Sequence, residues 1–554
     1  MKCSFLLALA MLLFTSNSVA QHAHSSSGEA KPAALVPGLG DIRHVVSTNN
    51  PEAQKFFDQG LALVYGFNHE EAVRSFKRAA ELDPQLAMAY WGIALALGPN
   101  INMDVDAERE KAAFEAVQKA LSLVSKTSDP ERAYIRALAT RYSNDPKADL
   151  KKLAVDYKNA MADVVRSLPD DLDAATLYAE SIMDLRPWQL WGRDGKPAEG
   201  TEEIVSVLES VLRRDPQHTG ANHYYIHAVE ASPHPEWALP SAQRLKVLAP
   251  AAGHLVHMPA HIDIRSGNYE AAARSNAYAA EADREYFKAT GQQGMYPMMY
   301  YSHNLHFLAV AHSMQGRYQD SKRAADQLHA HLSTFLQENG PMLEAILPIL
   351  DAFMETPTLI MVRFHRWDDL LKSPAPDQKL AATTAFWHFG RAMAYASTGK
   401  LDSAEKEQTL VVSAVNALPK DRPYGFNTVG AVFNIAGNVL SARIALAKND
   451  KHAAVEFLKK AIEVEDSLNY DEPEDWYIPV RESLGGILIT SGNYAEAEGV
   501  FRAELKKHPR NGRALFGLVE SLKKQNKTAA AQFVEREFGE AWKNSDIKLR
   551  VEDL

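Results

Sequence analysis

A spacing of small residues and phenylalanine recurs along the chain and constrains the fold more than any other feature. In FFDQGLALVYGFNHEEAVRSFKRAAELDP (56–84), Gly60 is followed by Ala72, Phe76, Ala79 and Pro84, at +12, +16, +19 and +24. Weaker copies of the central part are GNYEAA (267–272), GRYQDS (316–321), GKLDSA (399–404) and GNYAEA (492–497). The chain therefore contains an internal repeat, which has to be recognised before any other structural interpretation.

This pattern resembles the tetratricopeptide repeat, apart from Leu63 at the usual tyrosine position. The resemblance implies two antiparallel helices in about 34 residues, with small residues where the helices touch. We expect an all-α, right-handed superhelical solenoid of roughly 10–12 helix pairs. Such solenoids have a concave groove lined by the first helix of each pair, which generally binds a peptide or partner protein.

Composition and the N-terminus narrow the possible functions. A formal net charge of −10 without a dense Lys/Arg block argues against nucleic acid as a partner. Residues 1–20, MKCSFLLALAMLLFTSNSVA, have the layout of a cleaved secretory signal: an early Lys2, an apolar run and a small-x-small ending. We expect a protein secreted across the inner membrane, most plausibly to the periplasm, with no membrane span in the mature chain. The only cysteine, Cys3, lies in this signal, so the mature chain has no thiolate ligand.

The chain is divided accordingly into five sections. They are a signal peptide (1–20), a flexible lead-in (21–45), N-terminal helix pairs (46–220), central histidine-rich repeats with a metal or ligand groove (221–370) and C-terminal helix pairs (371–554).

Histidine is concentrated in the central repeats. NHYYIHAVE (222–230) contains His223, His227 and Glu230, GHLVHMPAH (253–261) contains His254, His257 and His261, and SHNLHF (302–307) contains His303 and His306. Residues three, four and seven apart share one face of a helix. The repeat register is set by the turns and second helices, not by the histidines. In this register, the faces that carry the histidines belong to three consecutive first helices and point towards the groove. Pro259 is the weak point, because a helix that begins there would leave His254 and His257 on a loop.

Helices pack about 8–10 Å apart, so imidazoles from neighbouring helices can share one ion or a close pair of ions. The predicted ligands are His223, His227, His254, His257, His261, His303, His306 and Glu230. Without thiolates, zinc, copper and iron all remain possible, and nickel is not excluded. Glu355 continues the row in the next repeat, and Glu230 or Glu355 is a candidate general base. Proximity in the sequence suggests Asn222, Asp263 and Asn304 as partners that orient the imidazoles.

Two functions of different classes follow. The first is an exported solenoid metalloprotein with one or two transition-metal ions, with hydrolysis or oxidation as possible chemistry. The second is a scaffold that binds a peptide or partner protein in the groove without catalysis. The acidic, aromatic stretch 469–486 is interpreted as a solvated loop, with a cap on one end of the groove as the alternative.

Overall fold

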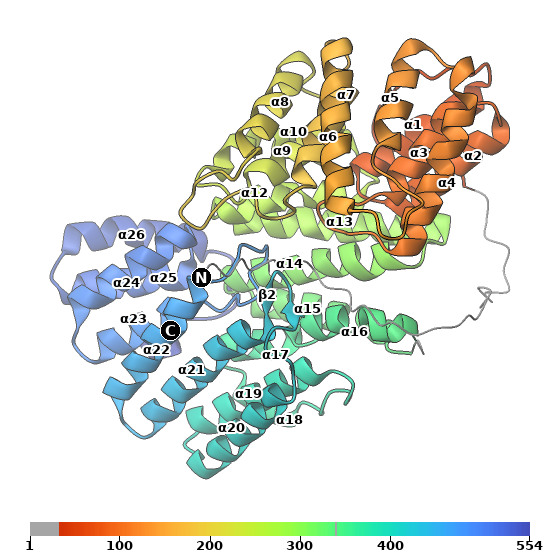
Figure 1. Cartoon of the computed structure of the whole chain (residues 1–554). Coiled ribbons are helices and arrows are strands. Elements are labelled where there is room, and N and C mark those ends of the chain that lie inside the picture. Colours follow the sequence, from red (N-terminus) through yellow and green to blue (C-terminus); the bar gives the residue numbers. More distant parts are fainter. Residues whose placement is uncertain (1–32, 338–340) are drawn as a thin grey trace, which may run out of the picture.

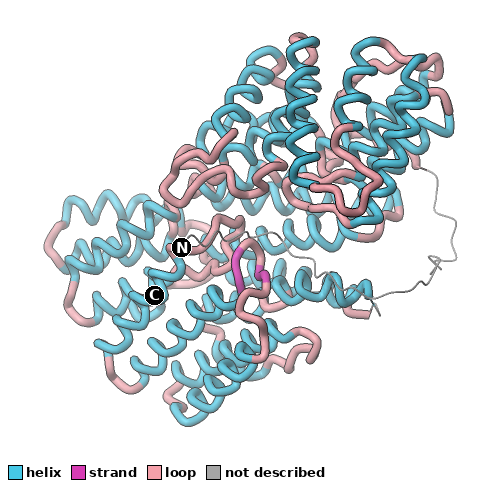
Figure 2. The backbone as a smooth tube through the Cα atoms, in the orientation of Figure 1, coloured by secondary structure: helices cyan, strands magenta, loops and turns pink. Residues whose placement is uncertain are grey.

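A computed structural model describes residues 33–337 and 341–554. The predicted signal peptide and part of the lead-in lie outside these residues. Helices make up nearly all the regular structure of the described chain (Figure 2).

The helices form twelve consecutive pairs within the described residues. In the first half these are α1 (Pro51–Tyr65) with α2 (His69–Leu82), α3 (Ala87–Leu97) with α4 (Ala107–Leu123), α5 (Asp129–Ala139) with α6 (Leu150–Ser167), α7 (Leu172–Met183) with α8 (Thr201–Arg214), α9 (Thr219–Val229) with α10 (Leu239–Leu248), and α11 (Gly253–His257) and α12 (Pro259–Arg265) with α13 (Tyr269–Thr290). In the second half they are α14 (Ser302–Met314) with α15 (Tyr318–Phe335), α17 (Thr356–Arg363) with α18 (Trp367–Lys372), α19 (Ala381–Ser397) with α20 (Leu401–Asn416), α21 (Val429–Ala447) with α22 (Lys451–Glu465), α23 (Val480–Thr490) with α24 (Tyr494–Lys507), and α25 (Gly512–Lys524) with α26 (Thr528–Ala541). The prediction of an all-α solenoid with 10–12 pairs is confirmed.

A few further elements interrupt this regular succession. Helix α16 (Pro341–Phe353) lies between the pairs, and the strands β1 (Pro423–Tyr424) and β2 (Asn427–Thr428) form a short antiparallel hairpin. Three 3-10 turns cover Val124–Lys126, Pro235–Ala238 and Val551–Asp553, and a π-helical turn covers Pro297–Tyr301.

The spacing of glycine and phenylalanine has a direct structural reason. The Phe76 ring lies against the backbones of Gly60 and Gly92, where a Cβ atom would lie only 2.6 and 2.5 Å from ring carbons. Phe501 is held in the same way by Gly485 and Gly517 near the other end of the chain. A larger residue at these glycines would force the helices apart, so the repeated spacing is a requirement of close helix packing.

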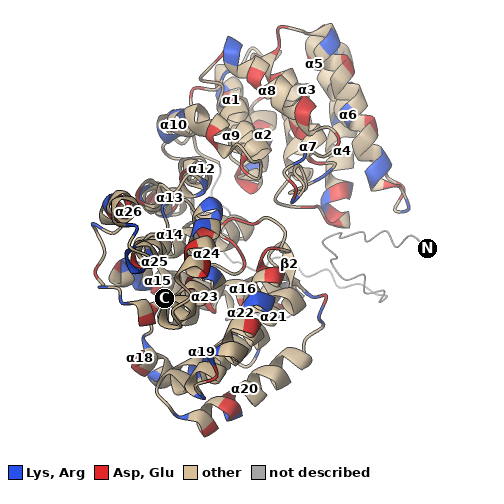
Figure 3. Cartoon of the chain, turned by 90° about the vertical axis from the view of Figure 1, so that its left-hand side faces the viewer, with Lys and Arg blue, Asp and Glu red and all other residues tan. Residues whose placement is uncertain are grey.

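The last helices return to the middle of the chain. Figures 1 and 3 both show α25 and α26 beside α12, α13 and α14. Asp546 accepts hydrogen bonds from the backbone N–H groups of Tyr318 and Gln319, both at 2.8 Å, and Ser545 donates to the carbonyl of Gly316 at 3.0 Å. These contacts, about 230 residues apart in sequence, turn the solenoid back on itself.

The hydrophobic core has two main parts that meet at the histidine-rich helices. One part extends from Leu39 to Tyr286 and includes Ile262, and the other extends from Ala260 to Leu554 and includes Phe307. Acidic and basic residues are interspersed along the helices of both halves (Figure 3).

Two helical stretches, Leu343–Arg363 and Val429–Ala447, have the length and apolar composition of membrane-spanning helices. About half of each is buried inside the protein, at 56% and 50% of the residues tested. Core helices have the same composition, so the feature is weak evidence for a span. The expectation of no membrane span in the mature chain stays a prediction.

Candidate metal centre

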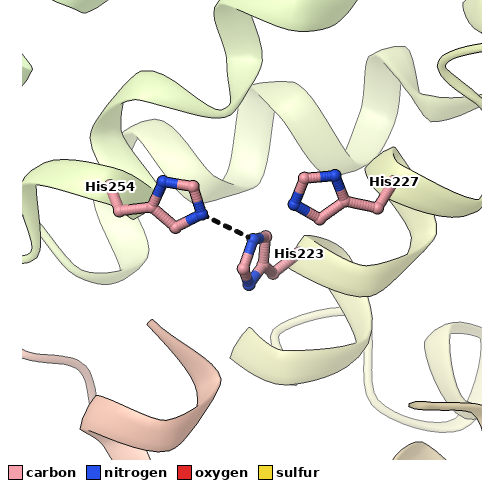
Figure 4. A group of neighbouring side chains, drawn as sticks. All are labelled: His223, His227 and His254. Carbon is pink, nitrogen blue, oxygen red and sulfur yellow. Dashed lines mark hydrogen bonds between the residues drawn. The ribbon is translucent and has the colours of Figure 1, made fainter. Parts of the chain in front are cut away.

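Helices α9 and α11 bring three histidines into one buried group, which we call triad A. Triad A consists of His223 and His227 on α9 and His254 on α11. One ring nitrogen from each lies within 4.8 Å of the others. The three rings are turned towards one another, and the Nε2 atoms of His223 and His254 are 3.1 Å apart (Figure 4).

A second group, triad B, lies directly beside the first. Triad B consists of His257 on α11, His261 on α12 and His303 on α14, again with a ring nitrogen from each within 4.8 Å. The Nε2 atoms of His257 and His261 are 2.8 Å apart. The rings of His254 and His257 are 5.8 Å apart between centroids, and those of His227 and His261 are 6.0 Å apart. The six imidazoles therefore form one continuous cluster with two centres.

Pro259 does not remove its neighbours from the helical face. The helix is interrupted only at Met258, whose φ of −48° and ψ of −37° are helical. Proline cannot donate the usual helical hydrogen bond, but a single missing bond leaves the axis continuous enough to keep the side chains aligned. The alternative that places His254 and His257 on a loop is wrong.

The outer nitrogens of three imidazoles are held by acceptors of the protein. Nδ1 of His223 lies 2.6 Å from the carbonyl oxygen of Tyr65, and Nδ1 of His257 lies 2.7 Å from Oδ1 of Asn276. The amide of Asn276 is oriented by its Nδ2, which donates to the carbonyl of Ala272 at 2.9 Å. Nδ1 of His227 lies 2.6 Å from Oε1 of Glu230. An imidazole that donates from Nδ1 keeps a free lone pair on Nε2, which is the arrangement of a metal ligand.

Glu230 connects the two triads. Its Oε1 contacts Nδ1 of His227 in triad A, and its Oε2 lies 2.7 Å from Nδ1 of His261 in triad B. Tyr470 donates its hydroxyl to the same Oε2 at 3.2 Å. Burial would raise the pKa of Glu230, but the neighbouring His261 and His227 outweigh it and lower the pKa below its ordinary value. The carboxylate therefore stays ionised behind the histidines, on the side away from their Nε2 atoms.

The inner nitrogens of the cluster lack ordinary partners. Nε2 of His227 is buried and has no hydrogen-bond partner. Nδ1 of His257 is directed at Oδ1 of Asn276, so a neutral His257 presents the lone pair of its Nε2 to Nε2 of His261, 2.8 Å away. Burial, followed by nearby imidazoles, lowers the pKa values of His223, His254, His257 and His303 well below the ordinary value. Facing lone pairs of neutral imidazoles repel each other unless a proton or a cation lies between them.

The comparisons with known proteins identify the repeat. A family model described as tetratricopeptide repeat matches residues 437–467, which cover most of α21 and α22. The match shows one tetratricopeptide repeat at residues 437–467, and the twelve helix pairs show an all-α solenoid of the same kind.

Solved structures similar to this chain also include tetratricopeptide repeat proteins. They include yeast Tom70 (13% identity, 88% of this chain and 92% of that chain, TM-score 0.30), human IFIT1 (14%, 88% and 90%, 0.32) and the TPR domain of P58(IPK) (11%, 86% and 99%, 0.22). No curated protein matches the sequence. At these identities and TM-scores, the similarity says nothing about what this solenoid binds.

The triads contain six of the seven predicted histidines. His306 lies apart from them, with its ring packed against Phe353 and Tyr477 at 5.3 Å between centroids. Glu355 is also outside the triads and is buried near Tyr424, and burial raises its pKa well above the ordinary value. Glu230 contacts Nδ1 of His227 and of His261 from behind.

The sequence did not reveal which groups orient the imidazoles. Asn222, Asp263 and Asn304 make hydrogen bonds with other residues of the solenoid, to Pro216, Lys246 and Asp283 among others. The groups that contact the histidines are the Tyr65 carbonyl, Asn276 and Glu230. The first is a backbone atom from a distant repeat and the second lies on a second helix, so the first-helix pattern gave no signal for either.

A distant segment of the same chain covers the cluster. In residues 469–477, Glu472, Trp476 and Tyr477 are buried, and the ring of Tyr470 lies beneath the Arg265 guanidinium at 5.5 Å. Tyr470 contacts Glu230 and Tyr477 packs on His306, so the segment lies over the histidine-bearing helices. The interpretation of this stretch as a solvated loop is wrong, because it is largely buried. Its contacts with Glu230 and His306 agree with the alternative of a cap.

Proposed function

We propose that this solenoid is a metalloprotein that binds two transition-metal ions, one in each triad. The observation that carries the proposal is the convergence of Nε2 atoms from imidazoles whose Nδ1 atoms are held by acceptors of the protein. A tetrahedral ion with nitrogen ligands at about 2.0–2.1 Å separates neighbouring nitrogens by about 3.3 Å. The Nε2 separations of 3.1 and 2.8 Å are close to that value and need only small side-chain movements.

The donor set limits the metal without naming it. Neutral imidazoles suit zinc, copper and iron, and the mature chain offers no thiolate. A bound metal of this kind would polarise a bound water or a substrate oxygen. A pair of ions could stabilise both the attacking and the leaving oxygen of a hydrolysis, or bind dioxygen. Around such a pair, Glu230 fixes the orientation of His227 and His261, and the neighbouring aromatic rings exclude bulk water. A hydrolase or an oxidase fits this arrangement.

The test is elemental analysis of the tag-free protein beside the double variant His227→Ala/His261→Ala. We expect close to two equivalents of transition metal in the parent and loss of both in a variant that keeps its helical circular dichroism. His234→Ala is the control, because the His234 side chain is exposed and contacts Glu236 and Trp237. A parent with no metal, and no uptake on titration with zinc, copper or iron salts, rules out the proposal.

The scaffold function is the alternative that the repeat family favours. A peptide that binds over the histidines would have to displace residues 469–477, which already contact Glu230 and His306. We therefore place the metal function first. A groove that binds a peptide should keep its affinity after a single His→Ala substitution. A metal-binding triad should instead lose its ion when one of its histidines is replaced.

We also propose that the protein acts after export, in the periplasm. The signal-like residues 1–20 support this, and the ligand set needs no reduced cysteine. Cell fractionation with N-terminal sequencing tests it: an exported chain that begins near Gln21 is expected, and a cytoplasmic chain that retains Met1 would contradict it.

A further inference from the structure

A small cavity lies beside triad A. Its volume is about 10 Å³, and its lining includes the apolar side chains of Ile101, Met183 and Leu190 together with Trp188, His227 and Glu230. A cavity of this size has room for about one water-sized molecule. The cavity is therefore too small for an organic substrate but sufficient for a ligand of one heavy atom.

Two buried polar atoms of the residues that line this cavity have no hydrogen-bond partner. They are Nε2 of His227 and Nε1 of Trp188. One can supply a lone pair to a metal, and the other is an N–H donor. Unpartnered polar groups are costly inside a protein, so two on one small cavity indicate a ligand that satisfies both.

Trp188 has an unusual backbone conformation, and its indole ring is held by contacts with other rings. Trp188 has a φ of +60°, which side-chain-bearing residues rarely adopt, and its ring packs on Phe426 of the β1–β2 hairpin at 4.7 Å between centroids. The same ring meets His227 edge-on at 5.5 Å. Such conformations persist where surrounding contacts enforce them, and they cluster at functional sites.

We propose that the metal in triad A keeps an open coordination position directed at this cavity, where it binds water, hydroxide or a similar one-atom ligand that accepts a hydrogen bond from Trp188. This inference rests on the proposed metal function. Three histidines and one exchangeable ligand are the arrangement of catalytic zinc sites, whereas structural sites fill all four positions with protein ligands. Triad A is thus the reactive centre of the pair.

Both triads have a buried phenylalanine beside them. The rings of His257 and His261 lie against Phe307, at 5.1 and 5.3 Å between centroids, and Phe67 lies against all three rings of triad A, at 4.5–5.8 Å. The cavity beside His227, and not an apolar ring, is what distinguishes triad A. The third ligand of triad B, His303, is half-buried.

The test uses fluoride, which resembles hydroxide in size and charge, and the Co²⁺-loaded variant His303→Ala. Removing His303 leaves triad A as the one complete triad, so the visible absorption bands of cobalt report on that ion. We expect fluoride to change these bands with a single binding constant. In this background, Trp188→Phe should weaken fluoride binding about tenfold or more, because a hydrogen bond to a charged group is lost. Leu190→Phe, which fills the cavity, should abolish binding.

The control is Trp237→Phe, which makes the same chemical change at an exposed position 45% accessible to solvent. It should leave fluoride binding unchanged. Cobalt uptake without any fluoride response, or equal fluoride affinity in the Trp188→Phe variant, would overturn the inference while leaving the metal function standing. A protein that takes up no cobalt would refute the metal function itself, and the inference with it.

Discussion

Triads A and B share helix α11 but differ in what surrounds them. His254 belongs to triad A and His257, one turn later, belongs to triad B. Triad A is wholly buried and supported by Tyr65 from the first repeat, whereas triad B is supported by Asn276 and includes the half-buried His303. One short helix therefore contributes a histidine to each of two adjacent groups that differ in exposure.

The largest expected effect separates the two triads on that single helix. His254→Ala should remove the ion of triad A and His257→Ala that of triad B, so each variant keeps one equivalent and the double variant keeps none. Elemental analysis gives the stoichiometry, and the cobalt absorption bands show whether the remaining ions differ. Loss of both ions from either single variant would show that the cluster is one indivisible site.

Glu230 should couple the triads. Because its two oxygens contact Nδ1 of His227 and of His261, Glu230→Gln weakens the support of one ligand in each triad. We expect metal affinity to fall about 10- to 100-fold at both sites, the usual effect of losing a group that orients a ligand. Competition with a chromogenic chelator measures the two affinities.

Asn276→Ala is the matched comparison, because Asn276 contacts only His257 within the triads. It should weaken triad B alone, by a similar factor. If Glu230→Gln affects one triad only, the proposed coupling is wrong.

His306, which lies outside the triads, should contribute to the pH dependence of the stability. Burial lowers its pKa from 6.5 to about 4. Between these two pH values the unfolded chain binds a proton that the folded chain does not, so the free energy of unfolding falls as the pH decreases. The contribution is about 1.4 kcal/mol per pH unit.

His306→Phe should therefore flatten the decrease of stability between about pH 6.5 and pH 4, measured by urea unfolding of the metal-free protein. The exposed His452→Phe on α22 is the control. Parallel curves for the parent and the His306→Phe variant would show that His306 is charged in the fold.

The repeat register explains which parts of the candidate site could be predicted from the sequence. Turns such as Gly267 and Gly316 fix the first helices, and those helices fix which face each histidine occupies, so the convergence of six histidines could be predicted from the repeat register. His306 shares the helical face with His303 but lies nearly one turn further along α14, next to Tyr477 instead of the other imidazoles. The spacing of residues on one face of a helix predicts towards which side they point. It does not predict where along the axis a neighbouring helix comes close.

The groups around the ligands depend on long-range closure of the solenoid. The carbonyl of Tyr65 lies 158 residues before His223, and Tyr470 lies 240 residues after Glu230. Local periodicity carries no information on how far a superhelix curves before its ends meet. The covering segment 469–477 could not be distinguished from a solvated loop for that reason.

The smallest expected effect tests this covering segment. Tyr470→Phe removes the hydroxyl that donates to Glu230 at 3.2 Å but keeps the ring under Arg265. Loss of one hydrogen bond, worth about 0.5–1 kcal/mol at this length, should weaken metal binding by about two- to fivefold. Because Glu230 contacts both triads, the two affinities should change together. A change confined to one triad, or a loss of more than about tenfold in chelator competition, would show that residues 469–477 do more than support the carboxylate.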